Sequence, residues 1–143
     1  MLTRIDHIGI ACRDLEAAAE FYVATFGLTV VSRETNEEQG VREAMLKVAD
    51  GSGGPSYIQL LEPLSPDSPV GKFLERRGEG VHHVGYGVTD VESALAELDG
   101  AGVRLIDSRA RHGSMGAAIA FLHPASVGGV LTELVQAAPE SGH

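Results

Sequence analysis

The chain has a single cysteine and no long apolar run, and each shortage excludes a class of protein. The lone Cys12 cannot form an intrachain disulfide framework and is compatible with a reducing compartment. No apolar run approaches the roughly 20 residues that a transmembrane helix needs. The N-terminus also lacks the basic and then apolar pattern of a signal peptide. We therefore expect a soluble protein of the cytoplasm.

Basic residues are scarce as well, which limits the possible partners. The chain holds 11 Lys and Arg against 20 Asp and Glu, so its formal net charge at pH 7 is −9. Such a chain has no general basic face that could bind nucleic acid or an anionic membrane. An anionic ligand would need a local basic cluster, and the stretches 72–77 and 104–111 are the candidates. Each basic residue taken alone is typical of a solvated surface.

Glycine, by contrast, is abundant. The 143 residues suffice for one domain with a buried core, and the 18 glycines suit short strands joined by tight turns. Periodicity and turn residues predict the order β-α-β-β-β twice along the chain. The first half has strands at 3–11, 28–35, 41–48 and 57–62, with a helix at 15–26 capped by Asp14. The second has strands at 82–88, 103–108, 117–122 and 130–136, with a helix at 91–101 capped by Asp90.

The two halves also repeat in sequence. Residues 6–11 (DHIGIA) return 76 residues later as 82–87 (HHVGYG), and 58–61 (IQLL) return 74 residues later as 132–135 (TELV). Each half therefore opens a strand with a histidine and closes a strand with an amide or a carboxylate. His7, Gln59, His83 and Glu133 make a plausible four-ligand site for a divalent metal ion.

Two such modules cannot each bury a sheet face unaided, so we expect them to pair. The predicted fold class is α+β, with two paired β-α-β-β-β modules forming a curved sheet and a cleft. A single domain would cover residues 1–137, with module one at 1–65, a connector at 66–80 and module two at 81–137. The connector carries a short helix at 70–77. Residues 138–143 form a tail outside the domain, and we expect the small and polar residues from 137 onward to be disordered.

Four segments resemble the methylmalonyl-CoA epimerases of the vicinal oxygen chelate superfamily. They are 6–11 (DHIGIA), 81–84 (VHHV), 121–124 (FLHP) and 128–134 (GGVLTEL). The resemblance runs from Asp6 to about Gln136 and implies the paired-module fold, an acyl-CoA substrate and a homodimer. It also implies a metal held by His7, Gln59, His83 and Glu133, and a catalytic base at Glu43.

The chemistry of such an epimerase explains this set of residues. A metal chelated by the thioester oxygen and the carboxylate would act as a Lewis acid for the enolate. Nitrogen and oxygen donors suit cobalt, nickel, manganese or zinc and do not choose between them; we rank cobalt first. Inversion requires a proton to leave one face of the carbon and to arrive on the other. Glu43 is the best candidate for one acid–base group, and Glu133 or a water for the other.

The acyl-CoA contacts are predicted at Ser114, Ser126 and Gly128. Ala117 stands where the family commonly carries a basic or polar residue, and Ala125 stands where it commonly carries a lysine. The way in which CoA would bind is therefore left open. Other polar residues receive structural interpretations. His82 alternates to the face opposite His83 and should pack or support the ligand residues. Glu62 should face away from the metal, and Cys12 should be a small core residue.

The prediction is therefore a metal-dependent epimerase that interconverts (R)- and (S)-methylmalonyl-CoA through an enolate. A glyoxalase-type isomerase acting on a glutathione hemithioacetal, or another acyl-CoA epimerase, would use a similar ligand set. An extradiol dioxygenase needs iron on two histidines and one carboxylate, and the additional Gln59 argues against it. A ligand-sequestering protein without catalysis would have no need of a complete ligand set or of a free base.

Overall fold

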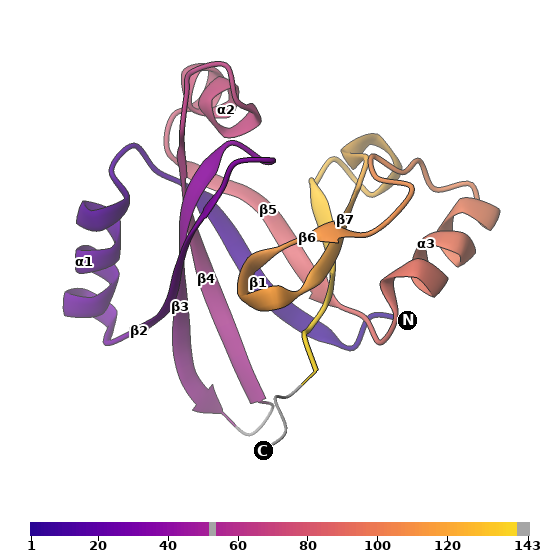
Figure 1. Ribbon diagram of the computed structural model, residues 1–143, viewed down its shortest axis with the longest axis horizontal. Helices are drawn as coiled ribbons and strands as arrows, with labels where there is room; N and C mark the ends of the chain where they lie inside the picture. Colours follow the sequence, from indigo (N-terminus) through magenta and orange to yellow (C-terminus); the bar gives the residue numbers. More distant parts are fainter. Residues whose placement is uncertain (52–53, 140–143) are drawn as a thin grey trace. The chain divides into compact units, whose positions relative to one another are not determined.

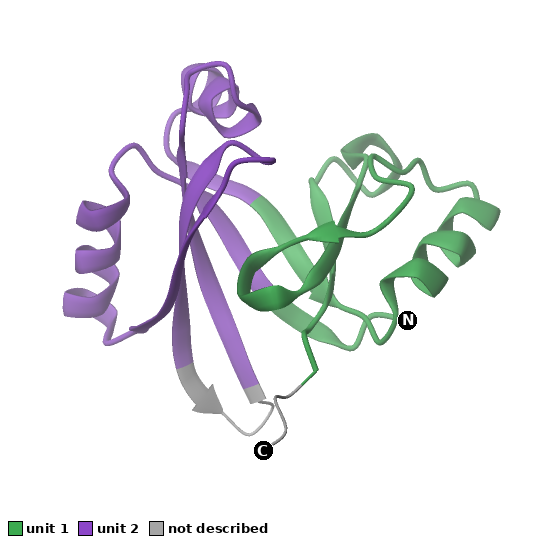
Figure 2. Ribbon diagram, in the orientation of Figure 1, with its two compact units in different colours: residues 1–6, 83–143 green, residues 7–82 purple. Residues whose placement is uncertain are grey.

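The computed structural model describes residues 1–51 and 54–139, which divide into two compact units (Figure 2). One unit holds residues 7–82, and the other holds residues 1–6 together with the chain from His83 onward. The units follow module one and module two of the sequence repeat, except that residues 1–6 fall in the unit of module two and residues 66–82 in the unit of module one. One boundary falls within the first strand and the other within the fifth, so the chain passes from one unit to the other at His7 and back again at His83.

Module one has the predicted order of elements (Figure 1). It consists of β1 (Arg4–Ala11), α1 (Leu15–Phe26), β2 (Thr29–Asn36), β3 (Val41–Gly51) and β4 (Gly54–Pro63), followed by α2 (Pro69–Arg77). The strand order is β2-β3-β4-β1. Strand β3 is antiparallel to both of its neighbours, and β1 is parallel to β4.

Module two repeats this topology with shorter outer strands. It consists of β5 (Gly80–Gly87), α3 (Val91–Gly100), β6 (Arg111–His112), β7 (Ala118–Leu122) and β8 (Thr132–Gln136), with 3-10 turns η1 (Ser114–Gly116) and η2 (Pro124–Ser126). The strand order is β5-β8-β7-β6, with β5 parallel to β8 and the other pairs antiparallel. The predicted β-α-β-β-β order is thus confirmed in both modules.

The strand predicted at 103–108 is wrong. Only Leu105 forms a bridge there, to Leu122, and the strand that pairs with β7 is β6 instead. The backbone N–H groups of Ile106 and Asp107 both donate to the carbonyl oxygen of Phe121, and the Asp107 carboxylate accepts from the Phe121 N–H at 2.9 Å. A side chain therefore takes the place of a backbone partner, and the ladder cannot continue.

Residues 137–139 lie in no helix or strand, and the rest of the predicted tail, 140–143, lies outside the described residues.

Both long helices begin at the predicted caps. The Asp14 carboxylate accepts from the Ala17 N–H at 3.1 Å, and that of Asp90 accepts from the Glu92 N–H at 3.1 Å. Helix α1 ends at Phe26 and is capped by Gly27, whose φ of +74° is a left-handed conformation that glycine adopts readily. No helix in the described part of the chain is both long and apolar enough to cross a membrane.

Each long helix covers one face of its own sheet. In module one, α1 packs on β3 and β4 through a cluster of buried residues that includes Leu15, Ala19, Ala44, Leu46 and Leu60. In module two, α3 packs on β7 and β8 through a cluster that includes Val91, Leu95, Ala120, Leu122 and Leu134. Side chains alternate between the faces of a strand, so the neighbours of these residues point to the opposite face.

Candidate metal and acid–base site

In module one, three of the predicted site residues share the sheet face that α1 leaves uncovered. Gln59 lies opposite Gly9 on β1 and Met45 on β3, and Glu43 lies opposite Leu61. Paired residues point to the same face, as do residues two apart in a strand. His7, Gln59 and Glu43 therefore step diagonally across β1, β4 and β3 on one face. All three side chains are buried, and Glu43 is 4% exposed.

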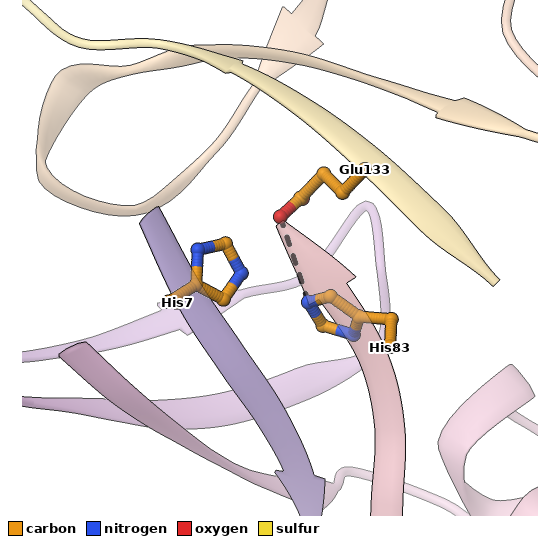
Figure 3. A group of neighbouring side chains, drawn as sticks. All are labelled: His7, His83 and Glu133. Atoms are coloured by element: carbon orange, nitrogen blue, oxygen red, sulfur yellow. Dashed lines mark ion pairs between the residues drawn. The ribbon is translucent and has the colours of Figure 1, made fainter. Parts of the chain in front are cut away.

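Module two presents its predicted ligands in the same way. Glu133 lies opposite Gly85 on β5 and Phe121 on β7, which places it on the face that carries His83. The His83 Nε2 and Glu133 Oε1 atoms are 3.5 Å apart, as the dashed line in Figure 3 marks. The Phe121 ring meets the imidazole edge to face, with centroids 5.4 Å apart. The contact with Phe121 was not predicted from the sequence.

The two histidines and the carboxylate form a group of metal-type donors. His7, His83 and Glu133 each offer one ligand atom, and these atoms lie within 4.8 Å of one another. Two imidazole nitrogens and a carboxylate oxygen, with no thiolate, suit the divalent ions cobalt, nickel, manganese and zinc. The donor chemistry therefore fits a divalent metal ion, without fixing which one.

The predicted substrate contacts lie on the turns of module two. Ser114 opens η1, where Met115 has a positive φ of 56°, which is uncommon for a residue with a side chain. The Ser126 Oγ accepts a hydrogen bond from the Arg104 N–H at 2.9 Å, so this hydroxyl also holds the chain before β6. Gly128 has a φ of +78°. The structural contact of Ser126 had no signal in the sequence, because its partner is a backbone group 22 residues away.

Comparison with known proteins identifies the family. Residues 6–121 match the family described as the Glyoxalase/Bleomycin resistance protein/Dioxygenase superfamily. The chain belongs to this superfamily. The match confirms the α+β fold of the vicinal oxygen chelate type that the sequence motifs implied.

Several known proteins are similar to this chain over nearly its whole length. The chain is 36% identical to the ethylmalonyl-CoA/methylmalonyl-CoA epimerase of Cereibacter sphaeroides, over 95% of this chain and 99% of that one. It is 39% identical to the uncharacterized protein YqjC of Bacillus subtilis, over 94% and 93% of the two chains.

Solved structures of superfamily members agree with this. The E43Q variant of Streptomyces coelicolor methylmalonyl-CoA epimerase, in complex with 2-nitronate-propionyl-CoA, is 58% identical, with a TM-score of 0.93 over 97% of this chain and 100% of that one. A methylmalonyl-CoA epimerase in complex with methylmalonyl-CoA and NH4+ is 57% identical, with a TM-score of 0.93 over the whole of both chains. These relatives are isomerases, and they confirm the resemblance to epimerases.

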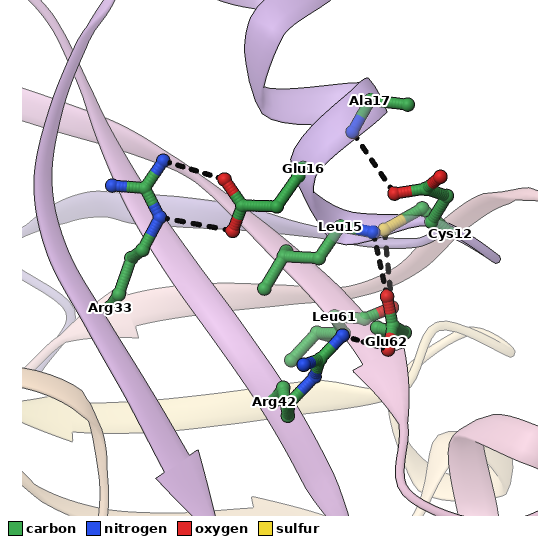
Figure 4. A network of polar contacts seen from close by, with 9 residues as sticks. Cys12, Leu15, Glu16, Ala17, Arg33, Arg42, Leu61 and Glu62 are labelled. Atoms are coloured by element: carbon green, nitrogen blue, oxygen red, sulfur yellow. Dashed lines mark hydrogen bonds and ion pairs between the residues drawn. The ribbon is translucent and has the colours of Figure 1, made fainter.

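Two polar residues of this superfamily member have the structural roles predicted for them. The His82 ring packs edge to face on the Phe73 ring of α2, with centroids 5.1 Å apart. Glu62 lies three residues after Gln59 on β4, so it points to the opposite face, where its Oε1 accepts from the Leu15 N–H at 2.7 Å and its Oε2 pairs with Arg42 (Figure 4).

Cys12 is a core residue, as predicted. It is 3% exposed, and its Sγ donates to the Leu61 carbonyl oxygen at 3.6 Å (Figure 4). Burial, followed by the negative charges of Glu62, Glu79 and Asp14, raises the pKa of this thiol from 9.0 to about 12. The thiolate is the reactive form of cysteine, so this thiol is poorly suited to act as a nucleophile.

Proposed function

We propose that this chain is an epimerase that interconverts (R)- and (S)-methylmalonyl-CoA by exchanging the proton at C2. The observation that carries the proposal is the 57% identity, over the whole of both chains, to a methylmalonyl-CoA epimerase in complex with methylmalonyl-CoA. The site supports it, because an acid–base carboxylate, Glu43, shares a buried face with His7 and Gln59. A proton bound to a carbon between two carbonyl groups is the kind that a carboxylate can remove.

One divalent metal ion, with cobalt ranked first, would be held by His7, Gln59, His83 and Glu133. When bound, the ion supplies Lewis-acid stabilisation of the negative charge that develops on the two carbonyl oxygens. The chain supports this assignment with three donors within 4.8 Å of one another and with the Gln59 amide on the same face as His7. The Phe121 ring packs at a right-angled geometry against the His83 imidazole, and this contact would limit the rotation of that ligand.

Glu43 would take the C2 proton. Its neighbours on the same face are Val41 and Met45 along β3 and Leu61 across β4, all of them buried. These apolar side chains exclude water from the carboxylate, so the proton that it removes is not lost at once to solvent. A second group must deliver a proton to the other face of C2, and Glu133 or a water would do this.

Ser114, Ser126 and Gly128 would contact the acyl-CoA, and the protein would act as a cytoplasmic homodimer. Exposed aromatic residues on α1 support self-association, because Phe21 is 55% exposed and Phe26 is 62% exposed. The two rings meet edge to face with their centroids 5.8 Å apart, and together they form an apolar patch on the outer side of the helix. Sedimentation equilibrium of the wild type and of Phe26→Ser tests the dimer; a monomeric wild type would contradict it.

Deuterium incorporation at C2 of methylmalonyl-CoA in D2O tests the proposed function. We expect rapid exchange and loss of optical purity with metal-loaded protein, and loss of both after chelation. The Glu43→Gln variant should retain its metal and lose exchange by about 10²–10⁴-fold, the usual contribution of a general base. Glu37→Gln is the matched control, because Glu37 is an exposed carboxylate in the turn before β3.

The outcomes separate the parts of the proposal. Normal exchange by a metallated Glu43→Gln protein would contradict the role of this residue as the base. No exchange by the metallated wild type would contradict the acyl-CoA substrate itself, and methylglyoxal with glutathione would then be the next substrate to assay. A purified protein that retains no divalent ion at all would favour a non-catalytic binding protein.

A further inference from the structure

Position 119 in module two is the counterpart of Glu43 in module one, and it carries an isoleucine. Glu43 lies opposite Leu61, which lies opposite Ala11 on the first strand of its module. Ile119 lies opposite Val135, which lies opposite Gly87 on the first strand of module two. The same register position, 76 residues apart in the sequence, therefore carries a carboxylate in one module and a branched apolar side chain in the other.

Ile119 lies among the site residues of its own module. It is 3% exposed and packs with Ala117, Val135 and Phe121, and the Phe121 ring also touches His83. It shares a sheet face with Glu133, which is two residues from its partner Val135. On its other side is Gly113, where an added Cβ would lie only 2.5 Å from the Ile119 Cγ2. Ile119 thus shares a face with a predicted ligand and packs against the start of the turn that carries Ser114.

The chemistry of the proposed substrate needs one apolar surface close to the reacting carbon. C2 carries two carbonyl groups, a hydrogen and an alkyl group, and only the alkyl group is apolar. In module one, two of the three apolar residues beside Glu43, Val41 and Leu61, already pack against Val70 and Leu74 of α2. In module two, the apolar cluster around Ile119 draws its described members from β7, β8 and the adjoining Ala117, with no helix residue among them.

We propose that Ile119 is a specificity-determining residue that contacts the alkyl substituent at C2 of a 2-alkylmalonyl thioester and restricts it to a methyl group. The inference rests on the proposed epimerase function. The repeat explains the asymmetry: one module supplies the base, and the equivalent position in the other supplies the surface for the group that is not exchanged.

The test measures deuterium exchange at C2 of methylmalonyl-CoA and of ethylmalonyl-CoA with metal-loaded protein. Ile119→Ala should raise the ratio of kcat/KM for the ethyl over the methyl substrate by about 10-fold or more, because one methylene in an apolar pocket changes selectivity by about 10–200-fold. Ile119→Val should give an intermediate rise and remains informative if the alanine variant does not fold. Leu122→Ala is the matched control, since Leu122 lies on the same strand but packs in the α3 cluster.

Each outcome has one meaning. An unchanged ratio in a folded, metal-loaded Ile119→Ala or Ile119→Val protein overturns the assignment to Ile119 and leaves the epimerase proposal intact. A rise produced by Leu61→Ala and absent from Ile119→Ala also overturns it, because the alkyl group would then contact module one. Wild-type protein that exchanges neither thioester would contradict the proposed function, and the specificity assignment would fall with it.

Discussion

At the scale of single residues, the Cys12 thiol gives a prediction about pH. Its pKa is 9.0 in ordinary surroundings and about 12 in the folded chain. Between these values the unfolded chain loses the thiol proton while the folded chain keeps it, so the free energy of unfolding falls as pH rises. Below pH 9 both states hold the proton, and this group contributes no pH dependence. Above it, the fall from this residue is up to about 1.4 kcal/mol per pH unit.

Urea denaturation of wild type and Cys12→Ala between pH 7 and 11 measures this effect. The difference between their unfolding free energies should be constant up to pH 9 and should then shrink, because every other titrating group cancels. Iodoacetamide should leave the native thiol unmodified at pH 8 and should alkylate it fully in 8 M urea. Rapid alkylation of the native protein would show that the thiol is neither as buried nor as weakly acidic as the structure indicates.

The same scale shows which site residues the sequence could predict. His7 and His83 were found because their chemical type repeats at a fixed offset, and the structure places both with Glu133. The Phe121 contact with His83 could not be found, because it depends on the register between β7 and β8. An isoleucine in a strand is typical of any core, so Ile119 gains a meaning only when the register makes it the counterpart of Glu43.

At the scale of the elements, the two long helices each begin with the same kind of hydrogen bond, in addition to their Asp caps. The Leu15 N–H donates to Glu62 Oε1 at 2.7 Å, and the Val91 N–H donates to Gln136 Oε1 at 2.9 Å. In each module, the closing strand therefore supplies a side-chain oxygen to the first N–H of the helix. Free N–H groups at a helix start need such acceptors.

This correspondence predicts the effect of changing Glu62. Glu62→Gln makes module one resemble module two, keeps the acceptor and loses only the ion pair with Arg42, so unfolding should become easier by less than about 1 kcal/mol. Glu62→Ala leaves the Leu15 N–H without its acceptor and should cost about 1–3 kcal/mol. Urea denaturation of both variants distinguishes them. Equal losses would mean that the ion pair, rather than the helix contact, carries the contribution of Glu62.

The prediction of elements failed where a side chain replaced a backbone partner. Apolar residues such as Val103 and Leu105 suggested a strand, but the Asp107 carboxylate takes the Phe121 N–H that a strand neighbour would have used. A pattern of apolar residues records burial and does not record which backbone groups pair. The helices were predicted closely because their caps, Asp14 and Asp90, act on groups within three residues.

At the scale of the whole molecule, the proposed metal ion has ligands from both modules. His7 and Gln59 belong to module one, and His83 and Glu133 belong to module two. A shared ion would couple the unfolding of the two modules. The predicted single domain over residues 1–137 also requires that the two modules unfold together. An ion that binds only the folded protein stabilises it by about 2.7 kcal/mol at 100 times its dissociation constant.

Calorimetric unfolding with cobalt and with EDTA therefore tests the whole arrangement without any assay of activity. Wild type with cobalt should unfold in one transition at a raised Tm. His7→Ala and His83→Ala should each lose nearly all of the cobalt-dependent shift, because either change removes a ligand of the same ion. His123→Ala is the control: this imidazole accepts from the Ala125 N–H at 3.1 Å, so its loss should lower Tm and leave the cobalt shift in place. If His7→Ala kept the full shift while His83→Ala lost it, module two would hold the ion alone, and the metal could not be what joins the modules.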